Sequence, residues 1–190
     1  MKLRDGLLAL ILYALLGPAS AALDLNQLMA DLARHPGGRA TFTERKYLAV
    51  LDKPVVSSGE MRFSPPAHME KRTLSPHPEV LVLDKDVVTL ERDKRRLTLR
   101  LDSQPEALAF VDSLRALLAG DRSALERSYA LQLVGDTQKW VLHLLPSDQR
   151  ISALVLRITV SGQGNQVRSI EYLQADGDRI VLDLLPIAGS

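Results

Sequence analysis

The chain has 190 residues, a formal net charge of +1 at pH 7 and no cysteine. Because it is almost neutral, it has no general electrostatic attraction to nucleic acid, and nucleic-acid binding is not expected. The lack of cysteine excludes disulfides, thiolate metal sites and a lipid anchor on a cysteine. A chain of this length can bury its own core, and no change in composition marks a second domain.

The N-terminus has the layout of a secretory signal peptide. Residues 1–4 are basic, residues 7–16 form an apolar run, and residues 19–22 are small. The apolar run is only about half of the ~20 residues that a membrane span requires. We therefore predict cleavage after Ala21 or Ala22, which leaves equal numbers of basic and acidic side chains in the exported domain. The predicted location is the periplasm of a Gram-negative cell, where the domain would be soluble.

Two segments have the three-and-four spacing of apolar residues that is typical of amphipathic helices. The first covers residues 24–34, begins at Asp24 as the expected N-cap and ends before Pro36 and two glycines. The second covers residues 105–119 and ends at Gly120. A shorter helix is expected over residues 123–127, which brings the predicted helices to about three.

The rest of the chain predicts about eleven strands, all antiparallel and joined by short turns. Hairpin turns are expected at 84–86, 93–94 and 176–178, where aspartate occurs with lysine or glycine. This order favours a mainly β fold with helices (α+β), built on a strongly curved sheet or a barrel. We expect both longer helices to bury their apolar stripes against the concave side.

Aromatic residues make up only 4% of the sequence, whereas leucine and valine are frequent. Such a composition fits an ordinary aliphatic core. It also fits a cavity for an alkyl chain, which needs smooth apolar walls and few hydrogen-bonding groups. Composition leaves both interpretations open.

Two early segments carry a resemblance to a known family. They are Phe42-Thr43-Glu44-Arg45-Lys46 and Ser58-Gly59-Glu60-Met61-Arg62-Phe63, which runs on to Pro65-Pro66. Behind an exported N-terminal helix, they resemble the periplasmic outer-membrane lipoprotein carriers of the LolA family, and the likeness extends through residues 153–160 and 167–173. It implies one lipid-carrier domain over residues 23–190: an incomplete antiparallel β-barrel whose apolar concave face is covered by a lid of α-helices.

The resemblance also implies a function without catalysis. Carriers of this family accept the acyl chains of a lipoprotein from an inner-membrane transporter and pass them to an acceptor at the outer membrane. Each methylene exposed to water costs about 0.8 kcal/mol, so an acylated molecule needs a dry container to cross the periplasm. The implied protein is a carrier or chaperone with no cofactor, and its neutral net charge and closed lid favour a monomer.

Three positions depart from the family pattern and mark a divergent member. The family has a basic residue before the proline that follows the glycine strand, and this residue helps to hold the lid closed. Ser64 or Pro65 takes that place here, Arg62 replaces an aromatic residue, and Glu44 replaces a glutamine. The cargo is then either a lipoprotein or another acylated molecule, such as a glycolipid or a polyene lipid.

We predict that the lipid-binding cavity is formed by the apolar side chains nearest the lid. They are Phe42, Met61, Phe63, Met69, Leu81, Leu97 and Leu99 from the sheet, and Leu108, Val111, Leu114 and Leu118 from the lid helix. Trp140 belongs either to the core or to the cavity wall. These assignments depend on the alternation along each strand, which a shift of one residue reverses.

Other functional sites are not indicated. The four histidines share no ligand spacing, so we predict no metal, and no acid, base and nucleophile occur in a catalytic pattern. An enzyme acting on lipids is therefore the weakest hypothesis. The alternative to a carrier is a periplasmic protein-interaction module whose concave side is filled by side chains and binds no lipid.

Residues 91–96 carry six charges in a row at an expected hairpin tip. A charged tip of this kind usually serves as a solvated turn that prevents edge-to-edge aggregation. Docking on a membrane partner or on anionic headgroups is the other hypothesis for this segment.

Overall fold

The computed structural model describes residues 23–34, 37–65, 67–103 and 105–187. The predicted signal peptide lies outside the described residues. Eleven strands make up the sheet: β1 (Gly38–Tyr47), β2 (Val55–Ser64), β3 (His68–Ser75), β4 (Glu79–Asp84), β5 (Val87–Arg92), β6 (Arg95–Arg100), β7 (Tyr129–Gly135), β8 (Trp140–Pro146), β9 (Val155–Gln163), β10 (Gln166–Gln174) and β11 (Arg179–Pro186).

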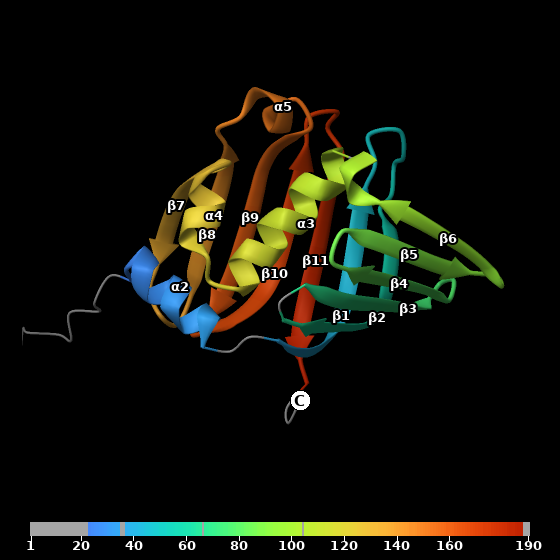
Figure 1. The fold of residues 1–190 in the computed structure, drawn as a ribbon, viewed down its shortest axis with the longest axis horizontal. Helices are drawn as coiled ribbons and strands as arrows, with labels where there is room; N and C mark the ends of the chain where they lie inside the picture. Colours follow the sequence, from blue (N-terminus) through green and yellow to red (C-terminus); the bar gives the residue numbers. More distant parts are fainter. Residues whose placement is uncertain (1–22, 35–36, 66, 104, 188–190) are drawn as a thin grey trace, which may run out of the picture.

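All neighbouring strands are antiparallel, in the order β6-β5-β4-β3-β2-β1-β11-β10-β9-β8-β7. The first and last strands therefore pair in the middle of the sheet, where Phe42 lies opposite Leu184 on one side and Gly59 on the other. The sheet is strongly curved but open, with β6 and β7 as its two edges (Figure 1). This confirms the predicted mainly β fold and its incomplete barrel.

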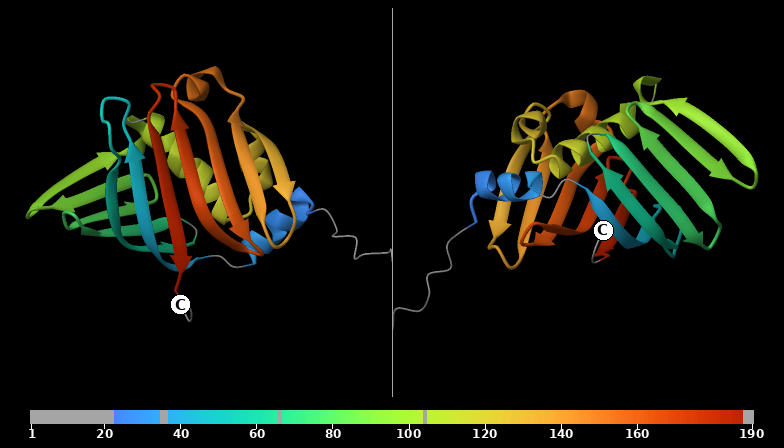
Figure 2. Two further views of the ribbon diagram at one scale, coloured as in Figure 1. Left: turned by 180° about the vertical axis from the view of Figure 1, so that it is seen from behind. Right: turned by 60° about the horizontal axis from the view of Figure 1, so that its bottom comes forward.

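Helices gather on the concave side of the sheet, except α5 (Gln149–Ser152), which lies at its rim in the connection between β8 and β9 (Figure 2). The others are α2 (Leu25–Ala33), α3 (Pro105–Leu118) and α4 (Arg122–Glu126), with a short 3-10 turn η2 (Leu101–Ser103) before α3. These three helices match the predicted segments. The helix α5 was not predicted because its single turn is too short to show a periodicity. None of the described helices is both long and apolar enough to cross a membrane.

The end of α3 is fixed by a glycine. Gly120 has a φ of 64°, and a Cβ atom there would lie 2.2 Å from the carbonyl oxygen of Met29 in α2. Only glycine allows this close approach of the two helices. At the N-terminus of α2, Asp24 occupies the N-cap position, but its side chain makes no capping hydrogen bond. The cap predicted from the sequence is therefore not formed.

One half of the concave side is filled by a core. Trp140, Leu142 and Leu144 on β8 are buried together with Leu28 of α2 and Leu117 of α3. The Trp140 indole donates a hydrogen bond of 2.8 Å to the carbonyl oxygen of Gly164, which satisfies its polar atom. Of the two alternatives for Trp140, the core and the cavity wall, the structure therefore shows the core.

The other half of the sheet, β3 to β6, extends beyond the helices (Figure 1). Cross-strand pairing gives two rows of side chains that share the concave face. One row is Met61, Lys71, Leu81, Leu90 and Leu97, and the other is Phe63, Met69, Leu83, Val88 and Leu99. Apart from Lys71, both rows are apolar.

Candidate functional site: an apolar groove under the lid helix

A groove of about 450 Å³ opens between the lid helix α3 and the middle of the sheet. Its apolar lining comes from the end of α2, from α3 and from strands β1, β2, β3, β10 and β11. Volumes in this range are typical of sites that bind small molecules. The groove exists because α3 crosses the sheet where the core of β8 and β9 gives way to the outer strands.

Five of the eleven predicted cavity residues line this groove. They are Met61, Phe63, Met69, Leu114 and Leu118. Val111 is buried in the adjoining core, and Leu108 packs against that core. The remaining four lie elsewhere on the concave face: Phe42 is buried outside the groove lining, and Leu81, Leu97 and Leu99 continue from the groove toward the edge strand β6.

The opposite wall of the groove was not predicted. It consists of Val167 and Ile170 from β10 and Leu182 and Leu184 from β11, with Leu32 of α2 near one end. A clear alternation is missing here: Val167 and Ile170 are three residues apart, and the apolar residues of β11 lie on both of its faces. What the sequence did not reveal is that β11 pairs with β1, which brings the end of the chain to its beginning.

Three arginines, Arg39, Arg62 and Arg168, also border the groove. Arg168 is the extra residue of a β-bulge, because the three residues 167–169 of β10 lie opposite only two residues of β9, Ser161 and Gly162. Bulges commonly redirect a side chain in this way. Neither Arg62 nor Arg168 forms an ion pair with another residue in the part of the chain that the structure describes. Positive charge therefore borders an otherwise apolar groove.

A buried ion pair interrupts the apolar face beside the groove. Lys71 Nζ lies 2.7 Å from Glu44 Oε2, and Lys46 Nζ lies 3.4 Å from Glu44 Oε1. Ser57 also donates a hydrogen bond of 3.3 Å to Glu44. The ammonium of Lys71 lies 4.8 Å from the centre of the Phe42 ring, so it covers the aromatic side chain that we predicted to face the ligand.

This arrangement shifts the acidity of Glu44. Burial alone would raise the pKa of this carboxyl, but the hydrogen bond from Lys71 and the charges of Lys71 and Lys46 outweigh burial and hold the pKa below its ordinary value. Glu44 is therefore ionised at neutral pH and fully compensated. The sequence had marked Glu44 only as a departure from the family pattern.

A second charged contact joins the lid helix to the sheet. Arg115 of α3 places Nη1 3.2 Å from Asp86, in the turn between β4 and β5, and 3.5 Å from Asp112 in its own helix. Arg115 Nε and Nη2 are buried and have no hydrogen-bond partner among the described residues. Burial raises the pKa of Asp112, Arg115 lowers it and Asp86 raises it again, with a net upward shift. The lid thus carries its own basic residue toward the sheet, although Ser64 cannot supply one from β2.

The described residues that line the groove do not form a catalytic arrangement of acid, base and nucleophile. Within the described parts of the chain, no group of three or more histidine, aspartate or glutamate side chains could hold a metal ion. The polar groups around the groove are arginines and amides, which bind but do not act as nucleophiles at neutral pH. What the site offers is apolar surface with a charged rim.

Comparisons with solved structures find similar folds at low identity. A LolA superfamily protein from Nitrosomonas europaea is 12% identical with a TM-score of 0.45, over 84% of this chain and 90% of that one. A putative outer membrane lipoprotein-sorting protein domain from Vibrio parahaemolyticus is 12% identical with a TM-score of 0.40, over 85% and 92%. A chain of the MucA/MucB complex of Pseudomonas aeruginosa is 16% identical with a TM-score of 0.46, and the match covers 88% of this chain and 59% of that one.

No curated protein matches the sequence. One family does: its sequence model, described as outer membrane lipoprotein carrier protein LolA-like, matches residues 17–188. This match covers nearly the whole chain and agrees with the resemblance carried by the first two strands. The protein is therefore a member of the LolA-like family of outer membrane lipoprotein carrier proteins.

Proposed function

We propose that this protein is a periplasmic carrier that binds the acyl chains of a lipoprotein or a related lipid and shuttles them from the inner toward the outer membrane. The observation that carries the proposal is the apolar groove between α3 and the sheet. The predicted signal peptide supports export to the periplasm. Family membership supports a carrier and gives no reason to expect an enzyme.

The physical basis is the transfer of methylene groups out of water. Each methylene buried in the groove contributes about 0.8 kcal/mol, so a chain of a dozen methylenes would gain on the order of 10 kcal/mol before the costs of ordering it. The polar end of the lipid would remain at the rim, near Arg62 and Arg168. By the family resemblance, an inner-membrane transporter would load the carrier and an outer-membrane acceptor would empty it. The near-neutral charge of the chain favours a monomer as the transport form.

The groove can be tested by changing the lid residues that line it. Leu114→Glu places a charge in the groove and should abolish the uptake of a fluorescent fatty acid, while circular dichroism shows that the protein still folds. Because Leu114 is also part of the core, Leu118→Trp provides a second variant that narrows the groove without adding charge. Val134→Glu, at an exposed position on β7, is the matched control. Normal uptake by both groove variants would place the ligand elsewhere.

Native mass spectrometry distinguishes a carrier from a protein-interaction module. The protein should be purified from the periplasm without detergent, and its co-purified lipids extracted. Bound acyl species would support the carrier and identify the class of its cargo. A mass without ligand, together with failure to take up a fatty acid, would favour the module that binds protein and not lipid.

A further inference from the structure

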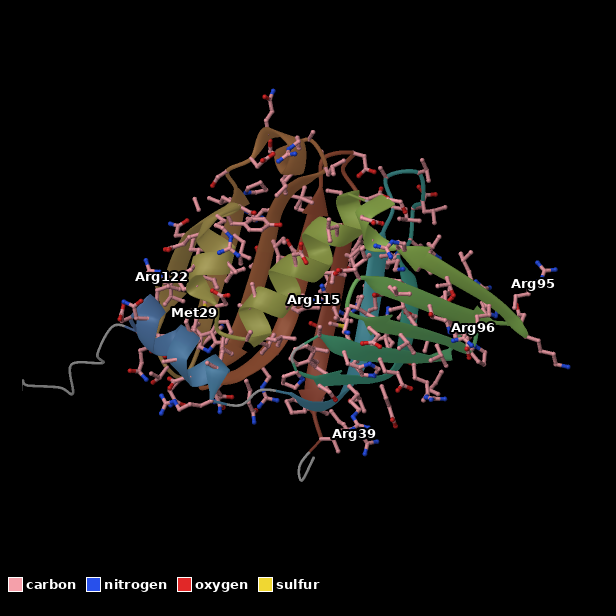
Figure 3. The ribbon with its side chains drawn as sticks, in the orientation of Figure 1. Met29, Arg39, Arg95, Arg96, Arg115 and Arg122 are labelled. Atoms are coloured by element: carbon pink, nitrogen blue, oxygen red, sulfur yellow. The ribbon has the colours of Figure 1, made fainter. Side chains whose placement is uncertain are left out.

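The tip of the β5–β6 hairpin forms a free corner of the sheet, away from the helices (Figure 1). β6 is an edge strand, and every one of its six residues is exposed. Arg95 and Arg96 lie at the tip of the hairpin, far from the lid residue Arg115 (Figure 3). The function proposed for the groove leaves this end of the sheet without a role.

The concave side of the hairpin is apolar and continuous with the groove. From the groove residue Met69 the row runs outward through Leu83 and Val88 to Leu99. Met69 and Leu83 are buried, at 7% and 2% exposure, whereas Leu99 at the outer end of the row is 40% exposed. The parallel row ends at Leu97, which is 52% exposed. An apolar strip thus leads from the groove to a water-exposed edge.

Positive charge surrounds the exposed end of this strip. Residues 91–100 contain five arginines and lysines against two acidic residues, although the chain as a whole is nearly neutral. The two acidic residues lie close to Arg92 and Arg96, at 3.6 Å and 3.5 Å. Lys94 and Arg95 have no ion-pair partner among the described residues. The tip therefore has free positive charge next to exposed leucines.

These charges lie on a tight hairpin turn beside an open hollow. Asp93 and Lys94 have φ values of 50° and 62°, the left-handed conformation that a two-residue hairpin turn requires. Basic residues of the tip border an open hollow of about 460 Å³ between the turn and the ends of β3 and β4; they are Arg92, Lys94, Arg95 and Arg96, and Arg72 of β3 lies on the far side of the hollow. Such a hollow has room for a phosphate group.

We infer that the β5–β6 hairpin docks on the surface of an anionic membrane. Arg92, Lys94 and Arg95 meet the phosphates of the headgroups, and Leu97 and Leu99 enter the region just below them. Basic residues combined with exposed aliphatic ones are the pattern that binds the interface of an anionic bilayer. A protein partner is favoured less, because the exposed strip has two leucines and no aromatic anchor of the kind found at protein interfaces.

Docking at this point would place the apolar strip directly between the bilayer and the groove. An acyl chain could then move along Leu99, Val88 and Leu83 without crossing water. The docking surface itself does not depend on the proposed cargo, since it lies outside the groove. A failure of one proposal therefore leaves the other standing.

Co-sedimentation with lipid vesicles tests the docking. The protein is purified from the periplasm and its N-terminus is checked by intact mass, because the apolar run at residues 7–16 would bind bilayers if it remained. Binding to vesicles of phosphatidylglycerol and phosphatidylcholine should exceed binding to phosphatidylcholine alone at least tenfold, and added salt should weaken it. Each basic residue near an anionic surface contributes roughly fivefold. Lys94→Gln/Arg95→Gln, which removes the two unpaired charges of the tip, should therefore bind more than tenfold more weakly.

Matched variants separate docking from general effects of charge and apolarity. Arg127→Gln/Arg150→Gln removes the same charge from exposed positions elsewhere and should bind like the wild type. Leu97→Ser/Leu99→Ser should lose binding severalfold, whereas Leu145→Ser/Leu185→Ser, with comparable exposure, should not. Leu114→Glu should still bind vesicles even where it no longer takes up fatty acid.

Two results would overturn the proposal. The first is equal binding of the wild type to anionic and neutral vesicles. The second is retention on native inner-membrane vesicles but not on pure lipid, which would identify a protein as the partner of the hairpin.

Discussion

At the level of single residues, the Glu44–Lys71 pair is a buried ion pair on an otherwise apolar part of the concave face. Both side chains are largely buried, and each compensates the other at 2.7 Å. Removing one partner of a buried pair leaves a charge without compensation, whereas replacing both partners by uncharged groups can be nearly neutral. The pair is therefore more sensitive to a single substitution than to a double one.

Lys71→Met should lower the free energy of unfolding by on the order of 3 kcal/mol, because Glu44 would stay buried with only Lys46 nearby. The double variant Glu44→Gln/Lys71→Met should lose less than the single one. Urea denaturation of the three proteins measures both differences. A double variant that is less stable than Lys71→Met would show that the pair does not act as a unit.

The same pair predicts a pH dependence. The pKa of Glu44 is lowered in the folded protein from its ordinary value of 4.5, so near and below that pH the unfolded chain binds more protons than the folded one. The stability due to this carboxylate is fully present above about pH 4.5 and is lost as the pH falls through the lowered pKa. Glu44→Gln should remove this part of the acid dependence, which denaturation at a series of pH values can detect. An unchanged acid slope in Glu44→Gln would contradict it.

The sequence alone predicts the position of Glu44 on the sheet but not that of its partner Lys71. Alternation along β1 places Glu44 on the same face as Phe42, which is visible in the residues themselves. Lys71 reaches Glu44 only through the register of three strands, in which a shift of one residue would send it to the convex face. Contacts that depend on register across strands could not be predicted from local patterns.

At the level of elements, the lid helix depends on packing and on one charged contact with the sheet. Leu114 and Leu117 of α3 are buried, while Arg115 pairs with Asp86 in the β4–β5 turn. A carrier must release its cargo, which favours a lid of modest stability. An ion pair whose acidic partner is 65% exposed has the modest strength that such a contact needs.

Asp86→Asn should weaken the attachment of α3 by about 1 kcal/mol or less, since exposed ion pairs rarely contribute more. Hydrogen exchange of the α3 amides should become up to about fivefold faster, and a bound fluorescent fatty acid should dissociate faster to a similar degree. Asp93→Asn is the control, because Asp93 is also exposed but pairs with Arg92 at the tip of the β5–β6 hairpin, away from the lid. Equal effects of the two variants would remove the special role of Asp86.

The elements themselves were largely predictable, because their signals are local. The spacing of leucines gave α3, and Gly120 gave its end. The same signals could not show which part of the lid contacts the β4–β5 turn. Arg115 looked like an ordinary charged residue of an amphipathic helix, since its partner lies in a hairpin 29 residues earlier in the chain.

At the level of the whole molecule, the fold divides the concave face into three zones. Helices and β8–β9 form a filled core, α3 and the central strands enclose the groove, and β4–β6 extend uncovered beyond it (Figure 2). The curvature and the antiparallel order followed from the sequence. The pairing of β1 with β11, which determines where the groove lies, did not follow, because nothing local links residues at the two ends of the chain.

A ligand that occupies the groove contacts both the lid and the central strands, and so it should stabilise the entire fold. A ligand present at 100 times its dissociation constant adds about 2.7 kcal/mol to the folded state. For a domain of this size, 1 kcal/mol corresponds to roughly 2–4 °C, so a long-chain fatty acid at that concentration should raise the Tm by about 5–10 °C. Leu118→Trp, which narrows the groove, should show little of this shift, whereas Val134→Glu should show all of it. Stabilisation of Leu118→Trp equal to that of the wild type would mean that the lipid binds outside the groove, with the uncovered face of β4–β6 as the next place to test.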